Sequence, residues 1–220
     1  MNREHLQLEY GLRFDWGLPG AKAVGAAADV AIVVDVLSFT TTLTVAVDAG
    51  IDVLPYRWND ESAERYASES DAVLAVRRSR VAHGQISLSP NTIRRTTAPR
   101  RLVLPSPNGS SICFELGAGS GVCVGASLRN ATAVAGWIAR HYTPRSVVSV
   151  IAAGEKWPGG ELRPAIEDLW GAGAVMCALT ATGWDAEVSP EALMAIAAEV
   201  DRSTAVPVLE SRVFRGRAVG

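Results

Sequence analysis

The chain has 220 residues, of which 48% are hydrophobic and 20% charged, and its formal net charge is −2. This length and apolar content suffice to bury a substantial core without disulfides, so we assign residues 1–220 to a single domain. The near-neutral charge predicts no polyanionic partner. Because no aromatic residues are interleaved with the local arginine clusters, we expect no nucleic-acid binding. No apolar run approaches the roughly 20 residues that cross a bilayer, so we expect no membrane association.

The three cysteines lie inside apolar runs at Cys113, Cys123 and Cys177, and their spacing fits no metal-binding motif. The N-terminus lacks the apolar core of a signal peptide. Together these features predict reduced, buried thiols in a cytoplasmic protein. The composition leaves a homodimer open.

Apolar runs alternate with helical segments along the whole chain. Strands are expected at 6–14, 30–34, 51–55, 101–104, 121–124 and 146–151. Helices are expected at 40–48, 60–69, 130–141, 164–181 and 190–201, with a short one ending at 116 and a short extended segment at 206–209. Continuous apolar strands that alternate with helices are typical of a sheet covered on both faces. The predicted fold class is α/β, a three-layer α/β/α arrangement with a mostly parallel or mixed central sheet.

Asp35 ends the most apolar of these strands and is followed within one helical turn by Ser38, Thr40 and Thr41. A carboxylate in such a place is costly unless it is paired, hydrogen-bonded or bound to a metal. One interpretation is that Asp35 only caps the following helix. The other is a ligand site, because a hydroxyl-rich helix start with free N–H groups can hold a phosphate.

A second polar loop follows the strand at 101–104 and contains Asn108, Gly109 and Ser110. Asn-Gly is common in ordinary turns, but after a buried strand the same loop offers an amide, hydroxyls and backbone donors to an anion. Asn130 begins a later helix and is interpreted either as its N-cap or as a ligand contact. These residues are the candidate substrate-binding groups, together with Ser38, Thr40 and Thr41.

Three further carboxylates lie near the last strand–helix unit. Glu155 follows the strand at 146–151, and Glu167 and Asp168 fall in the first turn of the next helix. Acidic residues there also have a purely structural explanation in the helix dipole. If they approach Asp35, however, the four carboxylates form a set of oxygen ligands that suits Mg²⁺. We therefore treat all four as candidate catalytic and metal-binding residues.

Four segments in order resemble the motifs of the 2-phosphosulfolactate phosphatase family. They are Val33–Thr42, Ser106–Ser110, Gly125–Ala131, and Ala152–Glu155 with Ala165–Ala174. The resemblance implies a magnesium-dependent hydrolase acting on a small anionic phosphorylated substrate, 2-phosphosulfolactate or a related phosphomonoester, in a step that belongs to coenzyme M biosynthesis in the family. By motif position it also implies site roles for Asp35, Asn108, Asn130, Glu155, Glu167 and Asp168.

The chain departs from the family pattern at Ser38-Phe39, where the family has Arg-Ala, so a positive charge is missing. Arg77 or Arg78 is a candidate to replace it. The alternative function is a catalytically degenerate protein of the same fold that binds an anionic metabolite.

Overall fold

The structure is a computed structural model that describes residues 3–57, 61–77, 80–117, 119 and 121–200. Its strands are β1 (Leu12–Trp16), β2 (Val30–Val34), β3 (Asp52–Tyr56), β4 (Val73–Leu74), β5 (Arg101–Pro105), β6 (Val122–Ala126), β7 (Val148–Ala152), β8 (Glu155–Lys156) and β9 (Leu162–Arg163). Its helices are η1 (Arg3–Leu6), α1 (Gly17–Gly20), η2 (Ala21–Gly25), α2 (Phe39–Asp48), α3 (Glu61–Glu69), α4 (Pro90–Arg94), α5 (Gly109–Leu116), α6 (Ala131–His141) and α7 (Ile166–Thr180). Residues 190–200 are also helical.

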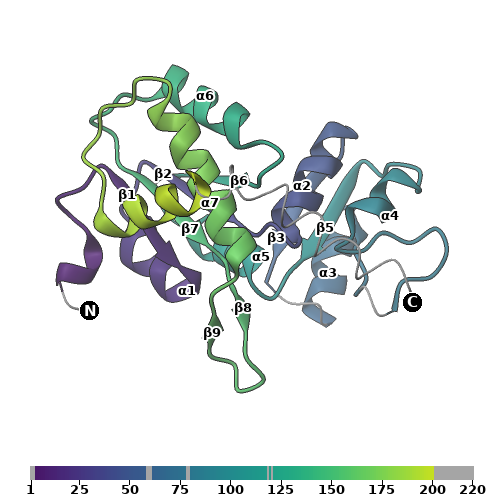
Figure 1. Cartoon of the computed structure of the whole chain (residues 1–220). Coiled ribbons are helices and arrows are strands. Elements are labelled where there is room, and N and C mark those ends of the chain that lie inside the picture. The colour runs from purple at the N-terminus through teal and green to yellow at the C-terminus, as the bar shows by residue number, and fades with distance from the viewer. Residues whose placement is uncertain (1–2, 58–60, 78–79, 118, 120, 201–220) are drawn as a thin grey trace, which may run out of the picture.

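The main strands form two parallel sheets, which lie in separate halves of the molecule (Figure 1). The larger sheet has the order β1-β7-β2-β6, and the smaller has the order β3-β5-β4. A third pair, β8 and β9, is an antiparallel hairpin that projects from the larger half. The predicted α/β class with parallel strands is confirmed, but the strands divide between two sheets instead of filling one central sheet. The assignment of residues 1–220 to one domain stays a prediction.

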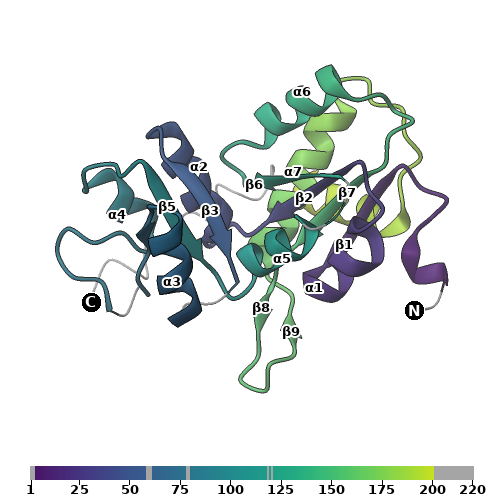
Figure 2. The same ribbon diagram turned by 180° about the vertical axis from the view of Figure 1, so that it is seen from behind.

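The larger sheet is covered by helices on both faces, as Figures 1 and 2 show from opposite sides. Alternate residues of β2 pack against the two helical layers. Val30, Ile32 and Val34 pack in a core with α6 and α7, whereas Ala31 and Val33 pack in a second core with α5 and η2. Because side chains of a strand point alternately to its two faces, an entirely apolar strand is what a sheet between two helical layers requires. This arrangement is the predicted three-layer α/β/α architecture.

The smaller sheet has its own core, formed where α2 and α4 pack against it. Phe39, Val45 and Ile51 meet Leu102 and Leu104 of the central strand β5 there. Strand β3 is only half-buried, in contrast to β2 and β7, whose residues are all buried. The smaller half is therefore the less extensively packed of the two.

Several local predictions need correction. The segment 6–14, expected to be one edge strand, contains the end of η1 and a turn before β1 begins at Leu12. Strand β1 pairs with β7 and is the edge strand of the larger sheet, as expected for this segment. Two of the helices that were not expected are α1, at residues 17–20, and α4, which lies within the segment 77–100. The extended segment at 206–209 lies outside the described residues.

Candidate active site

The site is a cavity of about 410 Å³ where the two sheets meet. Its walls come from the residues after β2, the residues after β5, the residues after β7 and the first turn of α7. In open α/β folds the carboxyl ends of parallel strands are the usual ligand-binding edge, because loops and helix N-termini converge there. The lining includes the four predicted carboxylates Asp35, Glu155, Glu167 and Asp168, together with Ser38, Ser106, Asn108, Gly154 and Lys156.

Asp35 is 7% exposed, and its carboxylate joins the two halves of the molecule. Oδ1 accepts a hydrogen bond from the Phe39 N–H at 3.1 Å, at the start of α2. Oδ2 accepts one from the Gly109 N–H at 2.9 Å, at the start of α5, and one from the Ser106 hydroxyl at 3.3 Å. Donors of this kind favour the ionised carboxylate, and the two helix N-termini add favourable dipoles. Asp35 therefore caps its helix and also faces the cavity.

Asp168 lies next to Asp35 and is 3% exposed. Its Oδ1 accepts a hydrogen bond from the Val36 N–H at 2.7 Å, and its Oδ2 accepts one from the Gly154 N–H at 2.9 Å. One side chain of α7 thereby holds together the loops that follow β2 and β7. Burial, and after it the charge of Asp35, raise the pKa of Asp168 from 3.8 to about 8. At neutral pH this carboxyl group therefore carries a proton.

The other two predicted acids lie at the edge of the cavity. Glu155 is exposed on the β8–β9 hairpin, and its Oε2 lies 2.7 Å from Nη1 of Arg163. Glu167 is half-buried at the start of α7. Within the described part of the chain, no three His, Cys, Asp or Glu side chains are grouped so as to hold a metal ion by themselves. The set does fit Mg²⁺, because its ligands are all oxygens and because Mg²⁺ is commonly bound by only one or two carboxylates plus phosphate and water.

The loop after β5 is built around Gly109 and Ser110. A Cβ atom at Gly109 would lie 2.6 Å from Asp35 Oδ2 and 2.7 Å from the Phe39 ring, so a glycine is needed for this approach. Ser110 is fully buried, and its hydroxyl donates to the carbonyls of Tyr56 and Ser106. Gly109 and Ser110 therefore shape the loop, whereas Asn108 lies on the cavity wall.

The hydroxyl groups after Asp35 are used mainly to hold the backbone. Thr40, which is fully buried, accepts from the Asp35 N–H and donates to the Asp35 carbonyl, and Thr41 donates to the Val36 carbonyl. Neither threonine is among the residues that line the cavity, and a substrate contact for them stays a prediction. Ser38 does line it, with its hydroxyl donating to the carbonyl of Leu88.

Asn130 lies away from the cavity. Its Oδ1 accepts from the Ser127 N–H at 2.8 Å, and its Nδ2 donates to the Gly125 carbonyl at 3.1 Å. These bonds close the turn between β6 and α6, as the structural interpretation of Asn130 expects, and the ligand interpretation stays a prediction. The signal was ambiguous because Asn is favoured both in such turns and at binding sites.

At the departure from the family pattern, Ser38 stands in the place of the arginine and lines the cavity. Phe39 stands in the place of the alanine and is fully buried in the core of the smaller half. Arg77, the proposed replacement for the missing cation, lines no described cavity, and Arg78 lies outside the described residues. Lys156 supplies a cationic residue to the cavity instead. Its place directly after Glu155 was the signal available in the sequence.

The three cysteines are free thiols, as expected, although each is half-buried and not fully buried. No helix among the described residues has the length and apolar character needed to span a membrane.

A two-sheet α/β fold with a buried acid pair and a polar loop at the strand ends defines a candidate enzyme site for a small anion. Residues 20–212 match the family described as 2-phosphosulpholactate phosphatase. The match spans most of the chain, and the protein belongs to this family. No curated protein shows significant sequence similarity to it.

Proposed function

We propose that the protein is a magnesium-dependent phosphatase that hydrolyses a small phosphorylated hydroxy acid, 2-phosphosulfolactate or a related phosphomonoester, and releases inorganic phosphate. The observation that carries the proposal is that two buried carboxyl groups, Asp35 and Asp168, line one cavity, and that burial raises the pKa of Asp168. A carboxyl group whose pKa is raised by its surroundings is typical of an acid–base site. Membership of a family named for a phosphatase supports the same reaction.

The acids have different roles in this proposal. Asp35 accepts hydrogen bonds from three donors and would contribute an oxygen to Mg²⁺, together with Glu155 or Glu167 at the edge of the same cavity. Mg²⁺, when bound, would neutralise charge on the phosphoryl oxygens. Asp168 holds a proton at neutral pH and lies on the same cavity, where it can donate that proton to the leaving oxygen of the ester.

The remaining groups position the substrate. Lys156 places a positive charge on the cavity wall, and Asn108 offers an amide. Phosphoryl transfer depends mainly on positioning and on charge stabilisation, which these groups supply without a covalent step. Hydrolysis adds water across the P–O bond: the hydroxy acid leaves with the proton from Asp168, and a proton of the attacking water restores the acid.

The first experiment measures phosphate release from 2-phosphosulfolactate and from a generic aryl phosphate, with Mg²⁺ and with EDTA. We expect release that EDTA abolishes, and a loss of at least about 100-fold in Asp35→Asn, because the substitution removes the charge that the cation needs. The exposed acid Asp185 provides the control Asp185→Asn, which should keep wild-type activity.

A second readout does not depend on turnover. Mg²⁺ should raise the melting temperature of the wild type and of Asp185→Asn, but not that of Asp35→Asn. Full activity of Asp35→Asn, or release that is indifferent to EDTA, would overturn the proposal. Stabilisation by phosphorylated ligands without any phosphate release would instead identify an anion-binding protein.

A further inference from the structure

The molecule has a second cavity beside the first, of about 430 Å³. The two share four lining residues, namely Pro107, Asn108, Glu155 and Lys156. They are therefore neighbouring parts of one cleft, with the acid pair in one part. Each part falls within the range of cavities that hold drug-sized ligands, about 300–1,000 Å³. A three-carbon phosphorylated acid in the first part would leave the second part unfilled.

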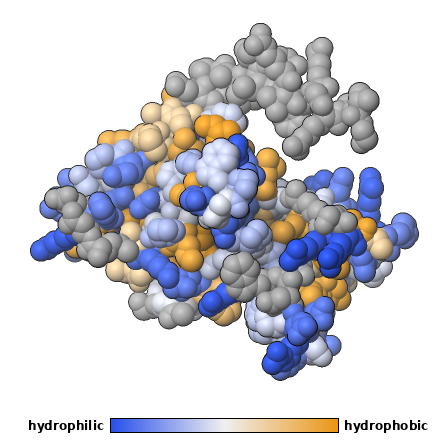
Figure 3. Space-filling model, turned by 90° about the horizontal axis from the view of Figure 1, so that it is seen from below, coloured by the Kyte–Doolittle hydropathy of each residue, from blue (hydrophilic) through white to orange (hydrophobic). Residues whose placement is uncertain are grey.

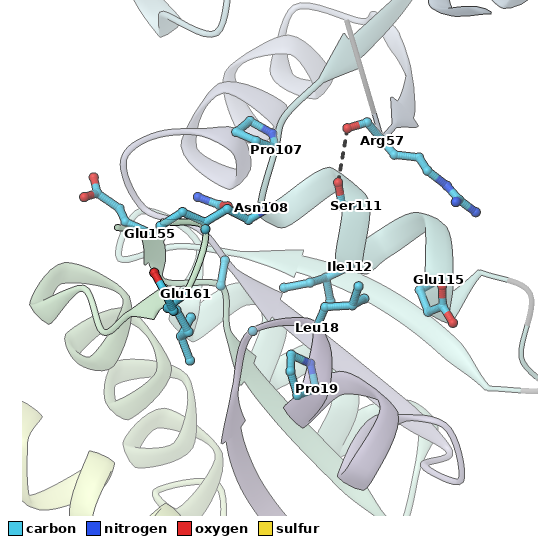
Figure 4. Close-up of a pocket in the computed structure, with 15 residues that line it drawn as sticks. Leu18, Pro19, Arg57, Pro107, Asn108, Ser111, Ile112, Glu115, Glu155 and Glu161 are labelled. Atoms are coloured by element: carbon cyan, nitrogen blue, oxygen red, sulfur yellow. Dashed lines mark hydrogen bonds between the residues drawn. The ribbon is translucent and has the colours of Figure 1, made fainter. Parts of the chain in front are cut away.

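The second cavity has an apolar interior. Figure 4 shows Leu18 and Pro19 of α1 and Ile112 of α5 close together, with Asn108 and Glu155 at one end and Glu115 at the other. Leu162 of the β8–β9 hairpin contributes a fourth apolar side chain. Contact with these four apolar side chains favours an uncharged carbon group, since a sulfonate against them would lose its hydration. The basic residues of the lining are Arg57 and Lys156.

The balance of charge around this cavity also argues against an anionic occupant. Three acidic residues line it, Glu115, Glu155 and Glu161, against the two basic residues Arg57 and Lys156. The first two form ion pairs outside the apolar part, Glu115 with Lys22 at 3.4 Å and Glu155 with Arg163 at 2.7 Å. Seen from below, the hairpin side of the molecule carries hydrophobic residues interspersed with hydrophilic ones (Figure 3). The apolar side chains of the cavity, bordered by charged ones, would suit a substrate with an apolar portion.

The hairpin is fixed to the site by its own apolar residue. Leu162 packs so closely that a Cβ atom at Gly154 would lie 2.8 Å from its Cδ1, and one at Gly17 would lie 3.1 Å from the same atom. Both glycines have positive φ, 65° and 61°, which glycine adopts most readily. Gly154 is also the residue whose N–H binds Asp168. The wall of the second cavity is thus continuous with the acid pair.

We infer that the substrate is a phosphomonoester with an apolar alkyl or aryl portion, which occupies the cavity formed by Leu18, Pro19, Ile112 and Leu162 while the phosphoryl group lies near Asp35. This inference rests on the proposed phosphatase function and gives its substrate class. It distinguishes the chain from an enzyme restricted to a short sulfonated acid.

The experiment compares kcat/KM for 1-naphthyl phosphate and for 2-phospholactate in the wild type and in Leu18→Trp. Leu18 is 37% exposed, so the larger side chain can occupy the cavity without disturbing the core. We expect the wild type to prefer the naphthyl ester, and Leu18→Trp to lower kcat/KM for that ester at least about tenfold while changing it less than about twofold for 2-phospholactate. The matched control is Leu8→Trp, at an exposed leucine outside the cavity, which should alter neither value.

A wild-type preference for 2-phospholactate, or an equal effect of Leu18→Trp on both esters, would overturn the inference. If neither ester is hydrolysed, the proposed function fails, and the inference is then decided by binding. Calorimetry with 1-naphthylmethylphosphonate, which cannot be hydrolysed, should show affinity that Leu18→Trp weakens at least about tenfold. Equal affinity in the two proteins would reject the apolar subsite.

Discussion

The two sheets contribute differently to the site. The larger sheet provides the buried acids, Asp35 directly after β2 and Asp168 from α7, which packs on that sheet. The smaller sheet provides the loop after β5, with Ser106, Asn108 and Gly109. The strands behind the acids are buried on both faces, whereas β3 beside the loop is half-buried. The ionisable groups are thus fixed by the stronger core, and the loop that closes on them belongs to the weaker one.

Gly109→Ala tests whether the two halves must meet at Asp35. The new methyl group would overlap buried atoms of Asp35 and Phe39, so we expect a loss of about 1–3 kcal/mol in the free energy of unfolding. Activity should also fall, because the Asp35 carboxylate must move. The control is Gly136→Ala in α6, where the new atom meets only the end of the Arg140 side chain. That change should stabilise the protein by about 0.5–1 kcal/mol, as measured by denaturant unfolding.

The pH dependence of stability tests the acid pair of the larger half. Because the pKa of Asp168 is raised to about 8, the folded protein retains a proton that the unfolded chain releases above about pH 4. The contribution of Asp168 to stability should therefore fall as pH rises from about 4 to about 8. In EDTA, the free energy of unfolding of the wild type should fall relative to that of Asp168→Asn as pH rises from about 4 to about 8. A difference that stays constant for Asp168→Asn across this window would contradict the assignment.

Thr40→Val tests how the larger sheet holds Asp35 in place. It removes both bonds to the Asp35 backbone and leaves a buried N–H unpaired, so we expect a cost of about 1–3 kcal/mol. Thr41→Val removes one bond, to the Val36 carbonyl, from a half-buried position and should cost about 0.5–1.5 kcal/mol. Thermal unfolding of the two variants side by side measures the difference. Equal melting temperatures would show that the Thr40 bonds are dispensable.

Local patterns were enough to predict most elements of this fold. The apolar run of β2, its abrupt end at Asp35 and the helix that follows are all encoded in neighbouring residues, and the structure reproduces them. The division into two sheets was not predictable, since strand pairing is set by contacts between distant segments. Strand β2 pairs with β6 and β7, far along the chain, and not with β3, the next strand in sequence.

The site was predictable where a residue type is costly without a function, and less so elsewhere. Asp35 was a candidate because a carboxylate that ends an apolar strand needs a partner, and Asp168 was a candidate because it could approach Asp35. Both are buried and line the same cavity. Thr40 and Asn130 were ambiguous, because the same side chains hold backbone turns as readily as they bind ligands. Lys156 was missed: it directly follows the candidate Glu155 in sequence, but only the fold places it on the cavity.

The chain leaves the larger sheet after β2 and returns to it at β6, two strands that lie side by side. The smaller half, which contains β3, β4 and β5, is therefore an insertion between β2 and β6, two neighbouring strands of the four-stranded sheet. Its entry passes through Asp35, and its exit passes through the Ser106–Gly109 loop that binds Asp35. The joints of the insertion are thus the walls of the cavity. A ligand bound there would lie against both segments that connect the two halves, Asp35 on one and Ser106 to Asn108 on the other.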